Sequence, residues 1–442
     1  MIQLELYTNG HWLTAADIEF GNHGEVTLRY LPEYFTDKAI AYDSRAEQAL
    51  SVNAPVSAIE TRYKRWPGLF DDLLPVGKAR DWWLQRLGIQ NLSYAEQQPL
   101  LLAHAVIAPV GNIRVKQAFE QSPTTAAQHF FTIAEVGALE YDFLEFASNR
   151  GAAVGGATGA HGVAPKLLLQ LDDQQRVSID ADFAGNAKIA TPYLVKFARN
   201  NRSERDNQIV QAEYSFYRTL HQLLGTSGIE TMNPAHMLLY TDPATRQSSL
   251  WLPRFDVYEQ QGTLQRLGME SIYSILDVSA GAQCNHFAVI DSVLERLQGL
   301  LAISTADFVK QYVVRDFLNM VFGNSDNHGR NISFLKRNGQ LYLAPIYDFA
   351  PMKADLEFIS RSFTWGQPYE NAGSVNYPLI ATKLARHIAP EELLSTLTEL
   401  AEQLRDLPDL LEANGCPVEI IAIPALALWS VEQRMRDYGV LS

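Results

Sequence analysis

Asp326, Asn331 and Asp348 have the residue types and the spacing of a phosphoryl-transfer site. Asp326 and Asn331 lie in the run Gly-Asn-Ser-Asp-Asn-His-Gly-Arg-Asn at 323–331, and Asp348 lies in Tyr-Asp-Phe-Ala at 347–350. An Asp, an Asn shortly after it and a second Asp beyond a hairpin are how phosphoryl-transfer enzymes arrange a proton acceptor and magnesium ligands. We therefore expect Asp326 to accept a proton and Asn331 and Asp348 to bind Mg²⁺.

A turn-rich surface loop is the structural alternative, because Asn, Ser, Asp and Gly all favour turns. That alternative explains Asp326 taken alone. It explains the ordered set less well, because Asn331, an Asn-Gly hairpin signal at 338–339 and Asp348 follow in succession. His328, between the Asp and the Asn, could contact a phosphate or stabilise the loop.

Two lysines and one glutamate could complete a nucleotide site. Lys196 interrupts the apolar strand Leu-Val-Lys-Phe at 194–197, and Lys166 follows a segment rich in Gly and Ala at 151–162. Glu213 is expected on the apolar face of the next helix, where it could pair with a lysine. Glycines let backbone N–H groups approach phosphates closely. Each feature also has an ordinary explanation: an exposed strand lysine, a partly exposed glutamate or a flexible surface loop.

A β-rich half is expected to precede a mostly helical half. Alternating or short apolar runs predict strands at 2–6, 26–30, 166–171, 193–197, 237–240 and 249–252. Apolar residues at helical spacing predict helices at 71–75, 79–87, 210–224, 271–278, 287–300, 306–322, 382–387, 390–412 and 423–438. Asn-Gly pairs at 9–10 and 338–339 predict hairpins.

The length of 442 residues and this division predict three units. We place an N-terminal unit at 1–112, a β-rich lobe with the Gly-rich segment at 113–252, and a mostly helical lobe at 253–442. The N-terminal unit has no residues that suggest chemistry, and we predict a packing or docking role for it. The whole is expected to be a two-lobed α+β fold.

Composition excludes several classes of protein. The formal net charge of −14 disfavours a free-standing nucleic-acid binder, because phosphate binding needs clustered Lys and Arg. Two distant cysteines form neither a disulfide framework nor a metal knuckle, which favours a reducing cytoplasm. The N-terminus has no signal-peptide pattern, and no apolar run is long enough for a membrane helix.

The chain resembles the HipA family of bacterial serine/threonine kinases, which act as toxins of type II toxin–antitoxin modules. The resemblance rests on short motifs at 30–34, 70–75, 162–166, 195–197, 212–214, 254–256, 323–331 and 344–348. It implies a two-lobed protein-kinase-like fold related to lipid kinases, with a small extra N-terminal subdomain that contacts the antitoxin. It also implies that ATP and Mg²⁺ are the cofactors.

The same resemblance implies roles for individual residues. Asp326 would be the catalytic base, with His328 and Asn331 beside it, and Asn331 and Asp348 would bind Mg²⁺. The residues expected to bind the nucleotide are Lys166, Lys196, Gly162, Val163, Glu213, Leu252, Arg254 and Phe255. Family substrates include aminoacyl-tRNA synthetases, and the usual partner is a small helix-turn-helix antitoxin. Contact with DNA would therefore be indirect.

Two positions depart from the family pattern. The Ser that is usually autophosphorylated in the Gly-rich loop is Gly159 here, so Thr158 becomes the candidate for regulatory phosphorylation. The resemblance implies that residues 252–255 form the hinge that receives adenine. Pro253 in this hinge removes a backbone donor, so we expect altered adenine recognition. Two other functions stay open: a small-molecule kinase on the same scaffold, and an ATP-binding pseudokinase or corepressor that acts through an antitoxin.

Overall fold

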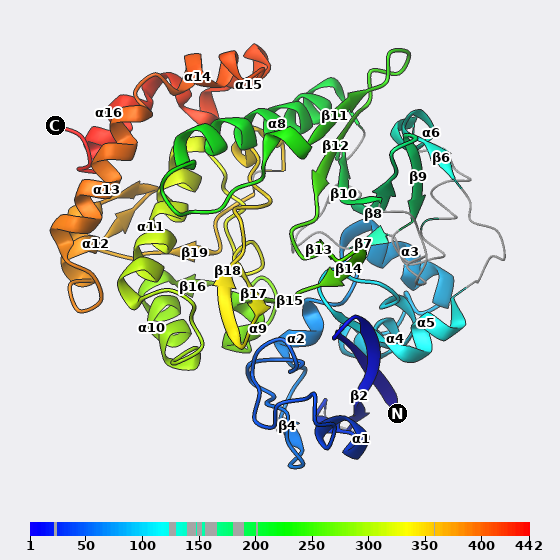
Figure 1. Ribbon diagram of the computed structural model, residues 1–442. Coiled ribbons are helices and arrows are strands. Elements are labelled where there is room, and N and C mark those ends of the chain that lie inside the picture. Colours follow the sequence, from blue (N-terminus) through cyan, green and yellow to red (C-terminus); the bar gives the residue numbers. More distant parts are fainter. Residues whose placement is uncertain are drawn as a thin grey trace.

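The computed structural model describes residues 1–21, 24–122, 130–138, 147, 153–154, 166–179, 190–199, 202–357 and 359–442. Most of the Gly-rich segment lies outside these residues, and so do three predicted site residues, Thr158, Gly162 and Val163. Figure 1 shows an N-terminal unit in blue and cyan, a green sheet lobe and a yellow-to-red helical lobe. No helix among the described residues is both long and apolar enough to cross a membrane.

The N-terminal unit is a small sheet covered by helices. Its strand order is β4-β3-β2-β1-β5, and β1 and β2 form a hairpin through Asn9-Gly10, both of which have positive φ. The strands are β1 Ile2–Thr8, β2 His11–Phe20, β3 Val26–Tyr30, β4 Thr61–Tyr63 and β5 Ile113–Val115. The helices are α1 Pro32–Phe35, α2 Gly68–Asp71, α3 Gly77–Leu87, α4 Tyr94–Ala105 and α5 Lys116–Gln121.

The sheet lobe places two lysines side by side. Its strand order is β11-β12-β10-β8-β9-β6, with β7 beside β8, and Lys196 on β10 pairs directly with Lys166 on β8. The strands are β6 Phe131–Thr132, β7 Ala153–Val154, β8 Lys166–Leu171, β9 Arg176–Ile179, β10 Thr191–Phe197, β11 Leu238–Thr241 and β12 Ser248–Pro253. Helix α6 Ile133–Ala138 packs near β6 and β9.

The long helix α8, Glu204–Leu224, joins the sheet lobe to the helical lobe. A capping box between Ser203 and Asp206 fixes its first turn. Its apolar side is buried, and Phe216 contacts the rings of Phe322 and Phe349, with centroids 5.1 and 5.9 Å apart. Glu213 lies on this buried side. The helix therefore carries a carboxylate into the seam between the lobes.

The helical lobe begins with short strands and continues as helices. Helix α11, Thr305–Phe322, is almost entirely buried from Tyr312 onward and ends at Gly323 in the left-handed conformation, with φ 73°. The Asp326 loop, residues 323–331, follows it. The remaining strands are β13 Val257–Gln260, β14 Thr263–Arg266, β15 Gly268–Ser271, β16 Cys284–Asn285, β17 Ser333–Arg337, β18 Gln340–Leu343, β19 Phe363–Thr364, β20 Glu370–Asn371 and β21 Ser374–Val375. The remaining helices are α9 Ile272–Leu276, α10 His286–Arg296, α12 Tyr377–Lys383, α13 Pro390–Gln403, α14 Leu407–Ala413, α15 Val418–Ile421 and α16 Val431–Asp437.

The predicted α+β plan, with a β-rich N-terminal part and a mostly helical C-terminal lobe, is confirmed. The prediction of single helices at 390–412 and 423–438 is wrong. Pro408 follows the end of α13 and lies in the first turn of α14, where its missing N–H costs nothing. Ala427, with φ 52°, breaks the last segment into short helical turns before α16. The unit boundaries at 112 and 252 stay a prediction.

Candidate active site

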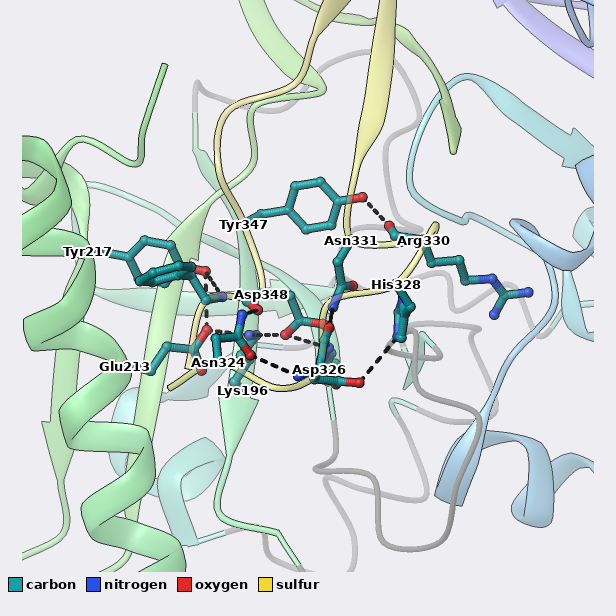
Figure 2. Close-up of polar contacts among 12 residues, drawn as sticks. Lys196, Glu213, Tyr217, Asn324, Asp326, His328, Arg330, Asn331, Tyr347 and Asp348 are labelled. Carbon is teal, nitrogen blue, oxygen red and sulfur yellow. Dashed lines mark hydrogen bonds and ion pairs between the residues drawn. The ribbon is translucent and has the colours of Figure 1, made fainter. Parts of the chain in front are cut away.

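The centre of the site is a carboxylate held by two lysines. Lys166 Nζ lies 3.1 and 2.9 Å from the two oxygens of Asp348. Lys196 Nζ lies 2.5 Å from Oδ1 of Asp348 (Figure 2). Lys196 also forms a short ion pair with Glu213. The side chains of Lys196 and Glu213 are each only 6% exposed. The register of β8 and β10 brings the lysines together, and α8 delivers the glutamate.

Charge pairing decides the protonation of this cluster. Burial acts to lower the pKa of Lys196, but the carboxylates of Asp348 and Glu213 outweigh it and raise that pKa. For Asp348, burial is outweighed by the two ammonium groups, which hold its pKa well below the usual range. Burial lowers the pKa of Lys166, against the attraction of Asp348. Asp348 is thus a carboxylate anion and Lys196 a cation at neutral pH.

A tyrosine missed by the sequence analysis holds this cluster in place. The hydroxyl of Tyr217, one turn after Glu213 on α8, donates to Glu213 Oε1 at 3.2 Å. The same hydroxyl accepts the backbone N–H of Phe349 at 3.2 Å. The helix therefore fixes the backbone next to Asp348, which has an unusual positive φ of 54°.

The Asp326 loop is folded by its own asparagines. Asn324 accepts the N–H of Asp326 at 3.2 Å and donates to the carbonyls of Asn319 (side chain, 2.8 Å) and Asp348 (backbone, 3.3 Å). Asn331 donates to the carbonyl of Asp326 at 2.7 Å (Figure 2). The loop is therefore buried and tied to Asp348, and it is not the surface loop of the alternative interpretation.

Asp326 is poised to exchange a proton. Burial, followed by the negative charge of Asp348, raises the pKa of Asp326 to about 7. His328 Nε2 lies 3.5 Å from Asp326 Oδ1. A carboxyl group whose pKa lies near neutral pH is well suited to accept a proton from a hydroxyl.

Two cavities meet at the lysine-bound carboxylate. The larger, about 150 Å³, runs from Lys166, Lys196 and Asp348 to the backbone at the end of β12, and is lined there by Leu252, Pro253, Arg254 and Phe255. The smaller, about 50 Å³, shares Lys166, Lys196 and Asp348 and reaches Asp326. A molecule in the larger cavity would thus meet one in the smaller cavity beside Asp348.

The backbone at the end of β12 lines the larger cavity, and one of its carbonyls points away from β10. The N–H of Arg254 is bound to the carbonyl of Pro192 on β10, at 3.0 Å. Successive residues of an antiparallel strand point their backbone groups to opposite sides, so the carbonyl of Pro253 points away from β10. Within the described part of the chain, the N–H of Phe255 has no hydrogen-bond partner. Pro253 therefore has a carbonyl on the side away from β10 but no N–H to offer on that side.

The side chain of Arg254 is paired with a neighbouring acid. It forms an ion pair with Asp256, whose Oδ2 also accepts the N–H of Gly111 at 2.7 Å. Arg254 thus contacts the cavity wall while its guanidinium fixes the hinge to the N-terminal unit.

A buried acid on α11 supports the Asp326 loop. Asp316 accepts hydrogen bonds from Trp365 Nε1 at 2.7 Å, Arg361 Nη2 at 2.9 Å and Asn327 Nδ2 at 3.2 Å. Burial would raise the pKa of Asp316, but His286 and Arg361 hold it well below the usual range. Asn327 belongs to the loop, so this anion links the helical core to the site.

Most predicted site residues converge, and several neighbours were missed. Asp326, Asp348, Lys166, Lys196 and Glu213 line the two cavities, and Leu252, Arg254 and Phe255 line the larger one at the hinge. His328 and Asn331 lie beside Asp326 in the same loop. The sequence analysis missed Tyr217, Asn324, Asp316, Tyr347, Arg330 and Asp72. Asp72 comes from the N-terminal unit: Asp72, Leu73, Leu74 and Val110 line the larger cavity, and the packing or docking role of this unit stays a prediction.

Comparison with known proteins identifies both parts of the chain. A family model described as the HipA-like C-terminal domain matches residues 158–407, and one described as the HipA N-terminal domain matches residues 13–116. No curated protein gives a match.

Two solved structures match the chain. One is the complex of the Shewanella oneidensis MR-1 toxin–antitoxin system HipA, HipB and its operator DNA, with a TM-score of 0.64 and 15% identity over 100% of this chain and 98% of that chain. The other is the Helicobacter pylori proinflammatory kinase CtkA, with a TM-score of 0.35 and 14% identity over 64% of this chain and 90% of that chain. The first shows the fold of the whole chain, and the second supports no argument.

The support from Asp316 predicts a pH-dependent loss of stability. Asp316→Asn should lower the free energy of unfolding at neutral pH by about 3 kcal/mol, because buried cations lose their counter-charge. The folded pKa of Asp316 lies below its unfolded value, so its stabilising effect is complete above the unfolded pKa and is lost as pH falls. The difference between wild type and variant, measured by denaturant unfolding, should shrink below about pH 4. The exposed control Asp409→Asn should show no such difference at any pH.

Proposed function

The chain belongs to the HipA family, and on that premise we propose that it is an ATP- and magnesium-dependent kinase that phosphorylates a serine or threonine of a protein. The observation that carries the proposal is the buried Lys196, which joins Glu213 to Asp348 beside the cavity that contains Asp326. A lysine held by a helix glutamate, next to a metal-binding Asp and a catalytic Asp, is what phosphoryl transfer from ATP requires.

The larger cavity suits a purine nucleotide. Adenine presents an amino donor and a ring-nitrogen acceptor on one edge, which match the carbonyl of Pro253 and the N–H of Phe255. Leu252 and Phe255 supply apolar walls for the base. At the other end of the cavity, Lys166 and Lys196 would meet the phosphates, because two buried ammonium groups favour a polyanion there.

The oxygen atoms near Asp348 suit magnesium. Asn331 Oδ1 is buried and has no hydrogen-bond partner in the described part of the chain, and Asp348 is a carboxylate whose present partners are two ammonium groups. Among the described residues, no group of three or more His, Cys, Asp or Glu could hold a metal by itself. This agrees with Mg²⁺, which protein sites hold through one or two oxygen ligands together with substrate phosphates. Magnesium would neutralise charge that develops on the phosphate oxygens.

Asp326 would activate the incoming hydroxyl. As the hydroxyl oxygen of the substrate bonds to the γ-phosphorus of ATP, the bond from that phosphorus to the β,γ-bridging oxygen breaks and ADP leaves. The hydroxyl proton passes to the carboxylate of Asp326, whose pKa of about 7 allows it to receive and later release that proton at neutral pH. Asn324 holds the Asp326 backbone, so the carboxylate meets the hydroxyl without reorganisation.

We also propose a small helix-turn-helix antitoxin as partner, with DNA contacted only through it. The similar Shewanella complex contains HipB and operator DNA, and the net charge of −14 disfavours direct DNA binding by this chain. An aminoacyl-tRNA synthetase is the proposed class of protein substrate, by membership of the family.

The proposal predicts that Asp326→Asn separates chemistry from binding. Transfer of labelled γ-phosphate to protein should fall by about 100-fold or more, because a general base typically contributes that much. Binding of ATP, measured by calorimetry, should persist, because the lysines and the hinge are intact. The exposed control Asp437→Asn should match wild type in both measurements.

Phosphoamino-acid analysis of the labelled products decides among the functions left open. Phosphoserine or phosphothreonine in protein supports the proposal. Label found only in a small molecule would indicate a small-molecule kinase. Bound ATP without transfer to any acceptor in cell extract would indicate a pseudokinase or corepressor.

The hinge geometry predicts different effects on ATP binding at positions 253 and 255. Pro253→Ala should leave the Kd for ATP unchanged, because the carbonyl of residue 253, the proposed acceptor, is retained. Phe255→Pro removes a donor together with the ring that lines the cavity, and should weaken binding by at least about tenfold, the effect of one lost hydrogen bond alone. Calorimetry on variants with wild-type thermal unfolding provides the measurement. Weaker binding in Pro253→Ala would contradict this account of adenine recognition.

A further inference from the structure

Helix α9 lies between the N-terminal unit and the Asp326 loop. On one side, Asn53 Nδ2 donates to the carbonyls of Ser274 and Ile275 at 3.1 and 3.0 Å, and α2 packs against α9 (Figure 1). On the other side, the ring of Tyr273 lies against Gly329, where an added Cβ would come within 2.5 Å of the ring. Only glycine allows so close an approach. The N-terminal unit and the loop are thus packed together through one short helix.

Arg330 forms a second and direct link. Its Nη2 donates to the carbonyl of Asp71, and its Nε lies 3.7 Å from Oδ1 of Asp72. Figure 2 shows its side chain turned away from the acids of the site, toward the blue ribbon of the N-terminal unit. Asp72 is fixed in turn by Ser271, whose N–H and hydroxyl donate to its two oxygens at 2.9 and 2.7 Å. The side chains of Arg330 and Asp72 are 11% and 17% exposed.

The backbone of Arg330 connects this link to the oxygens proposed to bind magnesium. Arg330 directly precedes Asn331. Its carbonyl accepts a short hydrogen bond from the hydroxyl of Tyr347, and Tyr347 directly precedes Asp348. The Tyr347 hydroxyl also pairs with Ser333 Oγ at 2.6 Å, on the strand that follows the loop. A shift of Arg330 would therefore move both Asn331 and Asp348.

We propose that Asp72 and Arg330 are positioning residues through which the N-terminal unit sets the placement of Asn331 and Asp348. The inference rests on the proposed function. The N-terminal unit is then part of the catalytic apparatus and not only a docking module. A partner bound to the N-terminal unit could reach the metal ligands through this ion pair, without entering the cavity.

The test compares Asp72→Asn, Arg330→Gln and the double variant in the full-length chain. Substitution of residues that orient metal ligands through hydrogen bonds typically changes metal affinity or activity by about 10- to 100-fold. Each single variant should therefore raise the Mg²⁺ concentration for half-maximal phosphate transfer by at least about tenfold. The Kd for ATP measured without Mg²⁺ should change by a smaller factor, because Asp72 and Arg330 line the larger cavity but the lysines and the hinge are unchanged.

The double variant tests whether the two residues act together. If Asp72 works through Arg330, the double variant should need no more Mg²⁺ than Arg330→Gln alone. Multiplying effects, or an unchanged Mg²⁺ dependence in the single variants, would overturn the proposal. Thermal unfolding identifies a variant that is misfolded. For the variants that fold, the ATP Kd checks that the cavity is intact. The exposed Asp81→Asn, in the same unit, is the matched control and should behave as wild type.

Failure of the proposed function gives a different result. Wild-type protein that binds ATP but transfers no phosphate would contradict the kinase proposal before any variant is compared. In that case, calorimetric binding of Mg²⁺ with a non-hydrolysable ATP analogue replaces transfer as the readout, and the same variants should still weaken it. Phosphate transfer by the wild type, with an unchanged Mg²⁺ dependence in the variants, would contradict the positioning role and leave the kinase proposal standing.

Discussion

The structure depends on a buried ammonium group, Lys196 Nζ, that is shared between the carboxylates of Glu213 and Asp348. Removing one partner of such a group would leave an uncompensated buried charge, which costs about 3–5 kcal/mol. The β8–β10 register, the capped start of α8 and the positive φ of Asp348 all bring these charges together. Elements from both lobes therefore have to keep fixed positions relative to one another.

The same carboxylate connects the two cavities. Lys166 and Lys196 hold Asp348 from the sheet lobe, while Tyr217 and Asn324 hold the backbone beside it. Burial is the larger cause of the raised pKa of Asp326, and the anion at Asp348 is the second. A charge that replaced the lysines at Asp348, such as a metal ion, would release two ammonium groups toward the phosphates of a bound nucleotide.

Local patterns made much of the site predictable. A cation in an apolar strand and a carboxylate on the apolar face of a helix can be recognised from spacing, which is why Lys196 and Glu213 were found. Residues that act from distant segments leave no such pattern. Asp72 is indistinguishable from a solvated acid in the sequence, and only the packing of α2 on α9 brings it to Arg330. The hinge shows the same limit, because the sequence reveals a proline at 253 but not which side of the strand its carbonyl faces.

The central claim is that Asp348 exchanges its lysine partners for a metal ion when a nucleotide is bound. The most direct measurement is the electron paramagnetic resonance of Mn²⁺ titrated with a non-hydrolysable ATP analogue, in wild type and in Asp348→Asn. The account predicts that wild type binds Mn²⁺ tightly only together with the analogue, and that Asp348→Asn loses this binding while its fold is retained. Equal Mn²⁺ binding in the two proteins would contradict it.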